Sequence, residues 1–239
     1  MSTGSSISVF AKRAVPGEVK TRLGRSIGLS RAAAFYRALA RDTLDVVADF
    51  RSIQRFVFFS PADNQAQCEE LAGNRAAEFE WRPQSSGDLG DRLFEAFREQ
   101  LEISERALVI GTDCPLLDRR VLSTALRSLR KHDVVIGPAR DGGYYLLGLR
   151  QAHERLFRDM PWSTEDVRNI TIERAQELGL SVDELVDLPD VDEASELPAL
   201  ASELREAWDA VREGKRDDFP CRTFRSLDWE LGVPPRRNT

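Results

Sequence analysis

The sequence predicts a doubly wound α/β fold, in which a mostly parallel sheet lies between two layers of helices. Short apolar runs such as 108–110 and 134–136 are rich in β-branched residues and end at glycine, which is typical of buried strands in such a sheet. Longer segments with apolar residues at helical spacing alternate with these runs. The chain has 239 residues and a hydrophobic content of 41%, which is enough to bury a substantial core.

Strands and helices alternate through the N-terminal half. The apolar run 7–11 predicts the first strand, and Ser30 is a candidate N-cap for a helix that continues to residue 47. The run 55–59 predicts the next strand, because a Ser-Pro pair follows it. The elements expected after it are a helix over 63–72, a short strand over 78–81, a loop over 84–90 and a helix whose apolar face carries Leu93, Phe94, Phe97 and Leu101.

The second half continues this alternation. Pro115 and Asp118 are well placed to begin a helix over 119–129, and Ser163 begins a capping-box pattern for a helix to residue 178. The other elements expected are strands over 107–110, 133–136, 144–149 and 181–188, and a helix over 197–211 with one apolar face. We expect one domain over residues 1–213 and a C-terminal tail over 214–239, in which no regular pattern is visible.

The composition argues against several classes of protein. The net charge of −6 disfavours a general nucleic-acid-binding surface, and no apolar run approaches the ~20 residues of a membrane span. Cys68, Cys114 and Cys221 are odd in number and far apart, so they predict neither a disulfide framework nor a metal knuckle. The first residues lack the pattern of a secretion signal. We therefore expect a cytoplasmic protein that does not bind nucleic acid, and the sequence leaves a homodimer open.

Two aspartates come soon after predicted strands. Asp113 lies in the segment 111–115, and Asp141 precedes two glycines in the segment 137–145. Open α/β sheets bind ligands at the carboxyl ends of their strands, so both acids are candidates for a ligand site. Two carboxylates in one crevice repel each other unless a cation lies between them, and oxygen ligands suit Mg²⁺ or Mn²⁺. Structural roles stay open, since Asp113 could cap a helix and Asp141 could form a hairpin turn.

A basic loop follows the first predicted strand. Residues 10–31 carry six basic residues against Glu18 alone, although the chain is acidic overall. Lys20 and Arg22 lie two residues apart, where an ammonium group and a guanidinium fork could hold phosphate oxygens. The loop is not a P-loop, because Val19 stands where that motif has a glycine. A small polyanion fits such a patch, but an ordinary basic surface loop has the same composition.

Seven motifs follow one another in a characteristic order within residues 7–200. They are Phe10-Ala11-Lys12, Pro16-Gly17-x-Val19-Lys20-Thr21-Arg22-Leu23, Asp88-Leu89-Gly90-x-Arg92, Gly111-Thr112-Asp113-Cys114-Pro115, Gly137-Pro138-Ala139-x-Asp141-Gly142-Gly143-Tyr144-Tyr145-Leu146-x-Gly148-Leu149, Trp162-Ser163-Thr164 and Asp190-Val191-Asp192. Together they resemble a bacterial family of GT-A-fold transferases of unestablished function that is often labelled glycosyltransferase. The pattern is also similar to that of the 2-phospho-lactate and molybdenum-cofactor guanylyltransferases. The ordered set is far more specific than any single motif.

The resemblance implies a three-layer Rossmann-like GT-A fold of the nucleotide-diphospho-sugar transferase superfamily. In such a fold the first loop would hold the nucleotide phosphates, which here points to Lys12, Lys20 and Arg22. A second loop would lie near the base, and its candidate residues are Gln84, Asp88 and Gly90.

The resemblance also implies a metal site. Asp113 would bind Mg²⁺ or Mn²⁺ together with a second acid near the C-terminal strand, for which Asp192 is the candidate and Asp190 the competitor. Two departures from related proteins bear on the reaction. The chain has Thr-Asp-Cys in place of the DxD motif of many glycosyltransferases, and it lacks the glycine-rich start of nucleotidyltransferases.

We predict a Mg²⁺-dependent transferase that uses a nucleotide-activated donor. Glycosyl transfer from a nucleotide sugar to a small-molecule acceptor is the first interpretation. Nucleotidyl transfer with release of pyrophosphate is the alternative, and a non-catalytic nucleotide- or metabolite-binding protein is the third. Lys20 and Arg22 would stabilise the leaving phosphate or pyrophosphate, and Asp141 would bind either the acceptor or the metal.

Overall fold

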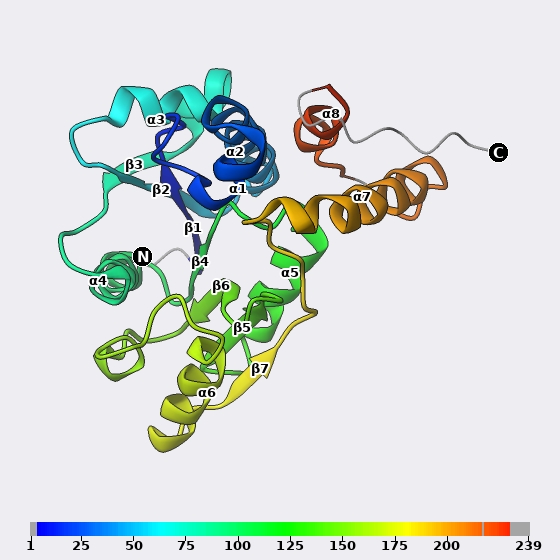
Figure 1. Ribbon diagram of the computed structural model, residues 1–239. Coiled ribbons are helices and arrows are strands. Elements are labelled where there is room, and N and C mark those ends of the chain that lie inside the picture. Colours follow the sequence, from blue (N-terminus) through cyan, green and yellow to red (C-terminus); the bar gives the residue numbers. More distant parts are fainter. Residues whose placement is uncertain (1–3, 217, 230–239) are drawn as a thin grey trace.

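A seven-stranded sheet runs through the molecule in the order β3-β2-β1-β4-β6-β5-β7 (Figure 1). The structure, a computed structural model, describes residues 4–216 and 218–229. β6 is antiparallel to β4 and β5, and all other neighbours are parallel, which confirms the mostly parallel sheet. The strands are β1 (Ser6–Lys12), β2 (Gln54–Ser60), β3 (Glu80–Pro83), β4 (Ala107–Ile110), β5 (Val134–Pro138), β6 (Tyr144–Leu149) and β7 (Val182–Glu184).

Helices cover both faces of the sheet and make three layers (Figure 1). On one face, α2, α3 and α5 pack against a cluster that includes Val9 and Val135. On the other face, α4 and α6 pack against Val109 and Leu147. The helices are α1 (Thr21–Ile27), α2 (Leu29–Ala48), α3 (Gln65–Ala72), α4 (Leu89–Ile103), α5 (Arg119–Ser128), α6 (Val167–Glu177), α7 (Leu197–Arg212) and α8 (Cys221–Trp229), with short 3₁₀ turns η1 (Gly73–Glu78), η2 (Glu154–Leu156) and η3 (Ala194–Glu196).

A buried polar network fixes α4 on its face of the sheet. Gln100 of α4 is fully buried, and its Nε2 donates to Ser8 Oγ of β1 at 3.0 Å. Ser6 Oγ donates to Gln100 Oε1 at 3.1 Å, so both ends of the amide are satisfied by strand residues. Buried polar groups cost free energy unless they are paired, and a paired set defines one relative position of helix and strand.

Two helix starts differ from the sequence prediction. α2 begins at Leu29 with Gly28 as its N-cap, so Ser30 lies inside the first turn and caps nothing. α6 begins at Val167, three residues later than the capping-box pattern predicts, and Ser163 has a left-handed φ of 67°. A tertiary contact explains the second error: the segment before α6 packs so closely on Gly142 that a Cβ there would lie 2.3 Å from the Glu165 carbonyl oxygen.

Part of the segment after residue 213 forms α8, which lies against α2. The backbone N–H of Thr223 donates to Asp42 Oδ2 of α2 at 2.7 Å, and Leu227 is 1% exposed. Burial raises the pKa of Asp42, although hydrogen bonds from Thr223 and Arg222 oppose the rise. Within the part of the chain that the structure describes, no helix combines the length and the apolar character that a membrane span needs.

Candidate functional site

A cleft of about 620 Å³ opens where the sheet's strand order reverses. The chain leaves β1 through α1 and α2 to reach β2 on one side, whereas β4 pairs with β1 on the other side. Open α/β sheets bind ligands in the crevice that such diverging connections leave at the carboxyl ends of the strands. Lys12 at the end of β1 and Thr112 after β4 both line the cleft.

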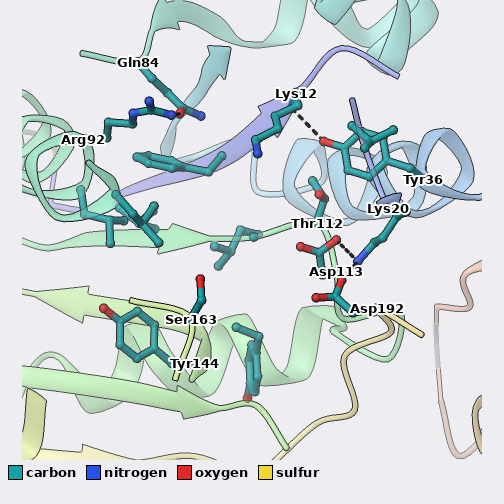
Figure 2. Close-up of a pocket in the computed structure, with 18 of the residues that line it drawn as sticks. Lys12, Lys20, Tyr36, Gln84, Arg92, Thr112, Asp113, Tyr144, Ser163 and Asp192 are labelled. Atoms are coloured by element: carbon teal, nitrogen blue, oxygen red, sulfur yellow. Dashed lines mark hydrogen bonds and ion pairs between the residues drawn. The ribbon is translucent and has the colours of Figure 1, made fainter. Parts of the chain in front are cut away.

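Lys20, Asp113 and Asp192 meet at one end of this cleft (Figure 2). The Lys20 Nζ atom lies 2.5 Å from Asp113 Oδ1 and 2.8 Å from Asp192 Oδ1. The lysine side chain is only 4% exposed, whereas the two aspartate side chains are 49% and 45% exposed. An ammonium group therefore supplies the positive charge that two converging carboxylates need.

The ion pairs govern the protonation of this cluster. Burial by itself would lower the pKa of Lys20, but Asp113 and Asp192 outweigh it and raise that pKa above its ordinary value. Burial would likewise raise the pKa of Asp192, but Lys20, followed by Arg22 and Lys12, outweighs it and lowers that pKa. Lys20 and Asp192 are consequently both charged at neutral pH, and the carboxylate faces the cleft.

A strained backbone places the lysine. Lys20 has φ 46° and ψ 45°, in the left-handed region, directly before α1. That conformation costs about 1–2 kcal/mol for a residue with a Cβ. It turns the side chain from the loop after β1 toward Asp113 and Asp192, which arrive from the loops after β4 and β7. Strain of this kind concentrates at functional sites, where the surrounding contacts maintain it.

Tyr36 of α2 ties the two strand ends together beneath the cluster. Its hydroxyl accepts a hydrogen bond from the backbone N–H of Lys12 at 2.8 Å (Figure 2). Burial raises the pKa of Tyr36 to about 12, and the neighbouring Thr112 opposes that rise. The phenol therefore stays neutral and holds the end of β1 at Lys12.

Two further cations line the cleft. Lys12 and Arg22 form no side-chain ion pair or hydrogen bond with any of the residues that the structure describes, and both lower the pKa of Asp192 from a distance. Arg13, between them in sequence, is instead paired with Glu18 at 2.6 Å. Of the basic loop, therefore, Lys12 and Arg22 are free to bind an anion in the cleft, and Lys20 is held beneath it.

Gln84 and Arg92 lie together at the other end of the cleft (Figure 2). The Gln84 Nε2 atom donates to the carbonyl oxygen of Phe58 at 2.9 Å. The Arg92 Nε atom donates to the carbonyl oxygen of Gly87 at 3.1 Å, and its Nη1 lies 3.5 Å from Gln84 Oε1. The guanidinium has no ion pair with the described part of the chain.

Asp88 and Gly90, two other candidates from the loop expected near the nucleotide base, have structural roles. Asp88 is the N-cap of α4, where it forms a capping box with Asp91. Gly90 allows close packing, because a Cβ there would lie 2.6 Å from the carbonyl oxygen of Phe157. Neither residue lines the cleft, whereas Leu89 between them does.

Asp141 and Asp190 lie beside the cleft and not in its lining. Asp141 Oδ1 accepts a hydrogen bond from the backbone N–H of Gly143 at 2.9 Å, within its own turn. Burial, followed by the charge of Asp141, raises the pKa of Asp190 to about 6. Of the two acids in the segment 190–192, Asp192 is the one that contacts Lys20.

Sequence reasoning missed several residues that line the cleft, among them Tyr36, Arg92 and Ser163. A signal existed for Arg92, which stands one turn after Asp88 in a motif already singled out. Tyr36 gave none, because a tyrosine on the apolar face of a helix is typical of core packing. Tyr144 and Tyr145 follow each other along β6, and both residues line the cleft.

An open, mostly parallel sheet with a cationic cleft at the point where its strand order reverses is a Rossmann-like α/β architecture with its ligand crevice in the usual place. Within it, the chain belongs to the family described as "Uncharacterized protein conserved in bacteria (DUF2064)", whose model matches residues 43–164. The resemblance found in the sequence is thereby confirmed. The comparison with curated proteins gave no match.

Solved structures support the same fold. A protein from Desulfovibrio desulfuricans G20, provisionally assigned as a nucleotide-diphospho-sugar transferase, is 29% identical with a TM-score of 0.84, over 98% of this chain and 97% of that one. A 4-diphosphocytidyl-2C-methyl-D-erythritol synthase from Anaerococcus prevotii DSM 20548 is 14% identical with a TM-score of 0.56, over 84% and 99% of the chains. The glucosyl-3-phosphoglycerate synthase of Mycobacterium tuberculosis is 12% identical with a TM-score of 0.51, over 90% and 82%. These neighbours are transferases, in agreement with the enzyme class that the sequence predicts.

Proposed function

We propose that the protein transfers a glycosyl group from a nucleotide sugar to a small-molecule acceptor. The observation that carries this proposal is the cluster of Lys20, Asp113 and Asp192 in the cleft, with Lys12 and Arg22 beside it and unpaired within residues 4–216 and 218–229. The arrangement offers a diphosphate cations for its oxygens and carboxylates for a bridging metal ion. The assignment of the 29% identical protein from D. desulfuricans supports the same donor class.

The carboxylate oxygens of Asp113 and Asp192 are suitable ligands for Mg²⁺ or Mn²⁺. Lys20 Nζ lies within hydrogen-bond distance of Oδ1 of each aspartate, and Oδ2 of Asp113 and Oδ2 of Asp192 form no hydrogen bond with the described residues. Mg²⁺ at nucleotide sites is commonly held by one or two carboxylates and the substrate phosphates. When bound, the ion would supply Lewis-acid stabilisation of the leaving diphosphate. Among the neighbours of the fold, the glucosyl-3-phosphoglycerate synthase was solved with Mn²⁺ and UDP.

The chain's own cations would position the donor. The Lys20 side chain is too deeply buried to change position when the substrate binds, so its role would be to hold Asp113 and Asp192 at a fixed separation. Lys12 and Arg22 are exposed and unpaired within the described chain, so they would bind the phosphate oxygens and neutralise charge that develops as the diphosphate leaves. In this way, catalysis would rest on positioning and electrostatic stabilisation.

Asp141 and Asp190 would serve the acceptor. The charge of Asp141 acts on Asp190, and each carboxylate is an oxygen acceptor for a hydroxyl group. A carboxylate whose pKa is about 6, as for Asp190, is better matched to accept a proton near neutral pH than an ordinary aspartate. Asp141 would orient the acceptor from outside the cleft lining.

Nucleotidyl transfer is the second candidate. Three cations, Lys12, Lys20 and Arg22, surround the carboxylates, and a triphosphate needs more charge neutralised than a diphosphate. The two reactions differ in which nucleotide the free protein prefers.

The test is calorimetric titration of the protein with matched nucleoside diphosphates and triphosphates, with and without Mg²⁺. Glycosyl transfer predicts that with Mg²⁺ the diphosphate binds at least as tightly as the triphosphate. A triphosphate that binds tenfold more tightly, about 1.4 kcal/mol, and that yields pyrophosphate with an acceptor would establish nucleotidyl transfer instead. Nucleotide binding with no turnover of any nucleotide sugar or triphosphate would support the non-catalytic alternative.

A further inference from the structure

The segment that follows α7 reaches back to residues 111–118, the loop after β4. The Arg216 side chain is only 13% exposed, and its Nη2 atom donates to the carbonyl oxygen of Leu116 at 3.4 Å. The same guanidinium lies 3.7 Å from Asp118 Oδ2, and its Nε donates to the carbonyl oxygen of Asp218 at 2.7 Å. Because a planar fork of N–H donors holds several acceptors at fixed positions, Arg216 ties the C-terminal segment to this loop.

Asp218 adds a second tie at the start of α5. Its Oδ2 accepts a hydrogen bond from the backbone N–H of Arg119, the first residue of that helix, at 2.9 Å. Asp118 caps the same helix through the backbone N–H of Val121 at 2.8 Å. Two N–H groups that the first turn of a helix leaves unpaired are thus satisfied. The stretch of backbone between Asp113 and α5 is consequently held at its far end by the C-terminal segment.

The C-terminal segment also contacts the part of the chain that carries Asp192. Val191 and Leu227 of α8 belong to one buried cluster, against which Leu116 and Phe219 pack. α8 lies beside α7, the helix that soon follows Asp192 (Figure 1). The two segments that supply the carboxylates of the cleft are therefore joined by the C-terminal segment.

Arg216 supports the cleft from outside its lining. Together with Cys114 it lines a second and smaller cavity. Because Cys114 follows Asp113 directly, a shift of the loop at Arg216 would move a carboxylate that must stay opposite Asp192. Metal sites depend on such supporting contacts, since a small displacement of one ligand weakens the whole coordination.

We infer that Arg216 is a positioning residue, which holds the loop after β4 so that Asp113 and Asp192 keep the separation that a bridging metal ion requires. The inference rests on the proposed function, because it assumes that these carboxylates bind Mg²⁺ together with a nucleotide. It gives the C-terminal segment, which lies beyond the residues 43–164 that the family model matches, a role in the chemistry of the cleft.

The test compares Arg216→Met with the wild-type full chain by calorimetry. ADP, GDP, UDP and CDP are titrated into each protein in Mg²⁺ and in EDTA, and the ratio of the two affinities is taken for the nucleotide that wild type binds most tightly. That ratio should fall by about tenfold in Arg216→Met, at the low end of the losses seen when groups that support metal ligands are removed. The affinity in EDTA should stay within about twofold, because Arg216 contacts neither Lys12 nor Arg22 within the described chain.

Arg222→Met is the matched control within the same segment. Arg222 pairs with Asp42 at 3.2 Å and with Asp45, so it holds α8 on α2 and forms no hydrogen bond or ion pair with residues 111–118. Both variants should melt at a lower temperature than wild type, but only Arg216→Met should lose the Mg²⁺ effect at a temperature where all three proteins are folded. Arg216→Lys keeps the positive charge and loses the planar fork, so it should restore the melting temperature more fully than the Mg²⁺ effect.

The inference is overturned if Arg216→Met keeps the wild-type Mg²⁺ effect, or if Arg222→Met loses it to the same degree. If no nucleoside diphosphate binds the wild-type protein in Mg²⁺, the proposed function fails instead. Hydrogen exchange then decides the positioning role by itself. The amides of residues 111–118 should exchange faster in Arg216→Met than in Arg222→Met, and equal rates would overturn that role.

Discussion

The loops that follow β4 and β5 are similar in sequence, but their aspartates occupy different positions relative to the cleft. Each follows an apolar strand, contains glycine and carries an aspartate, Asp113 in one and Asp141 in the other. Asp113 lines the cleft and pairs with Lys20, whereas Asp141 accepts a hydrogen bond from Gly143 in its own turn and lies outside the lining. A carboxylate at a strand end is therefore not by itself a site.

Two physical differences separate the loops. β4 is a direct neighbour of β1 and borders the point where the strand order reverses, whereas β4 and β6 stand between β5 and β1. The loop after β4 leads to a helix, whose N-cap is Asp118, so Asp113 is released from capping. The loop after β5 leads into the antiparallel strand β6, so Asp141 belongs to a hairpin turn. Its carboxylate accepts a hydrogen bond from the backbone N–H of Gly143 in that turn.

The most direct test of the difference between the two loops is to remove Lys20, the cation that contacts Asp113 in the loop after β4. Lys20→Met should lower the free energy of unfolding by about 2–3 kcal/mol at pH 7, because Asp113 and Asp192 would then face each other with no charge between them. The low pKa of Asp192 contributes stability above its unfolded pKa, and that contribution is lost as the pH falls through the folded value. The deficit of the variant should accordingly shrink toward pH 3.

Urea unfolding of both proteins at pH 7 and pH 3 measures the effect of Lys20→Met. Arg22→Met is the control, since that exposed side chain has no ion pair within the described chain and should change stability by less than about 0.5 kcal/mol. An equal loss of unfolding free energy in the two variants would mean that the buried ion pairs of Lys20 stabilise the protein no more than an exposed arginine does.

A second prediction contrasts the two aspartates directly. Asp113→Asn should weaken Mg²⁺-dependent binding of a nucleoside diphosphate by about 30-fold, close to 2 kcal/mol, because a charged ligand of the proposed metal is lost. Asp141→Asn should change the same affinity by less than about threefold, because its turn keeps the side chain out of the cleft lining. Calorimetry with and without Mg²⁺ gives both values. Equal effects would show that the two loops contribute alike.

The smallest expected effect concerns Asp190, the neighbour of Asp141. Its pKa of about 6 in the folded protein lies above the ordinary value, so the folded state binds the extra proton and loses stability as the pH rises from about 4 to about 6. Asp190→Asn should therefore stabilise the protein by about 1–2 kcal/mol at pH 7 without metal, and the gain should vanish below pH 4. Unfolding curves across this range check the sign. A variant that is less stable at pH 7 would contradict it.

Strand periodicity was the most reliable guide to the fold. The predicted strands over 107–110 and 144–149 coincide with β4 and β6, and those over 7–11 and 55–59 lie within a residue of β1 and β2 at each end. These strands are largely buried, and a strand that is buried on both faces is mostly apolar. The starts of helices were predicted less accurately. The capping-box pattern at Ser163 does not begin α6, because the segment before α6 packs against Gly142.

The sequence by itself determined the layered α/β architecture, the family and the two loops that contribute Lys20 and Asp113, because each depends on local patterns and ordered motifs. Only the tertiary structure decided that an ammonium group lies between the two carboxylates, and that Arg92 with Gln84 forms the far end of the cleft. Those facts depend on the strand order and on one left-handed residue at position 20. Strand order brings distant segments together through packing of the whole chain, which no short stretch of sequence encodes.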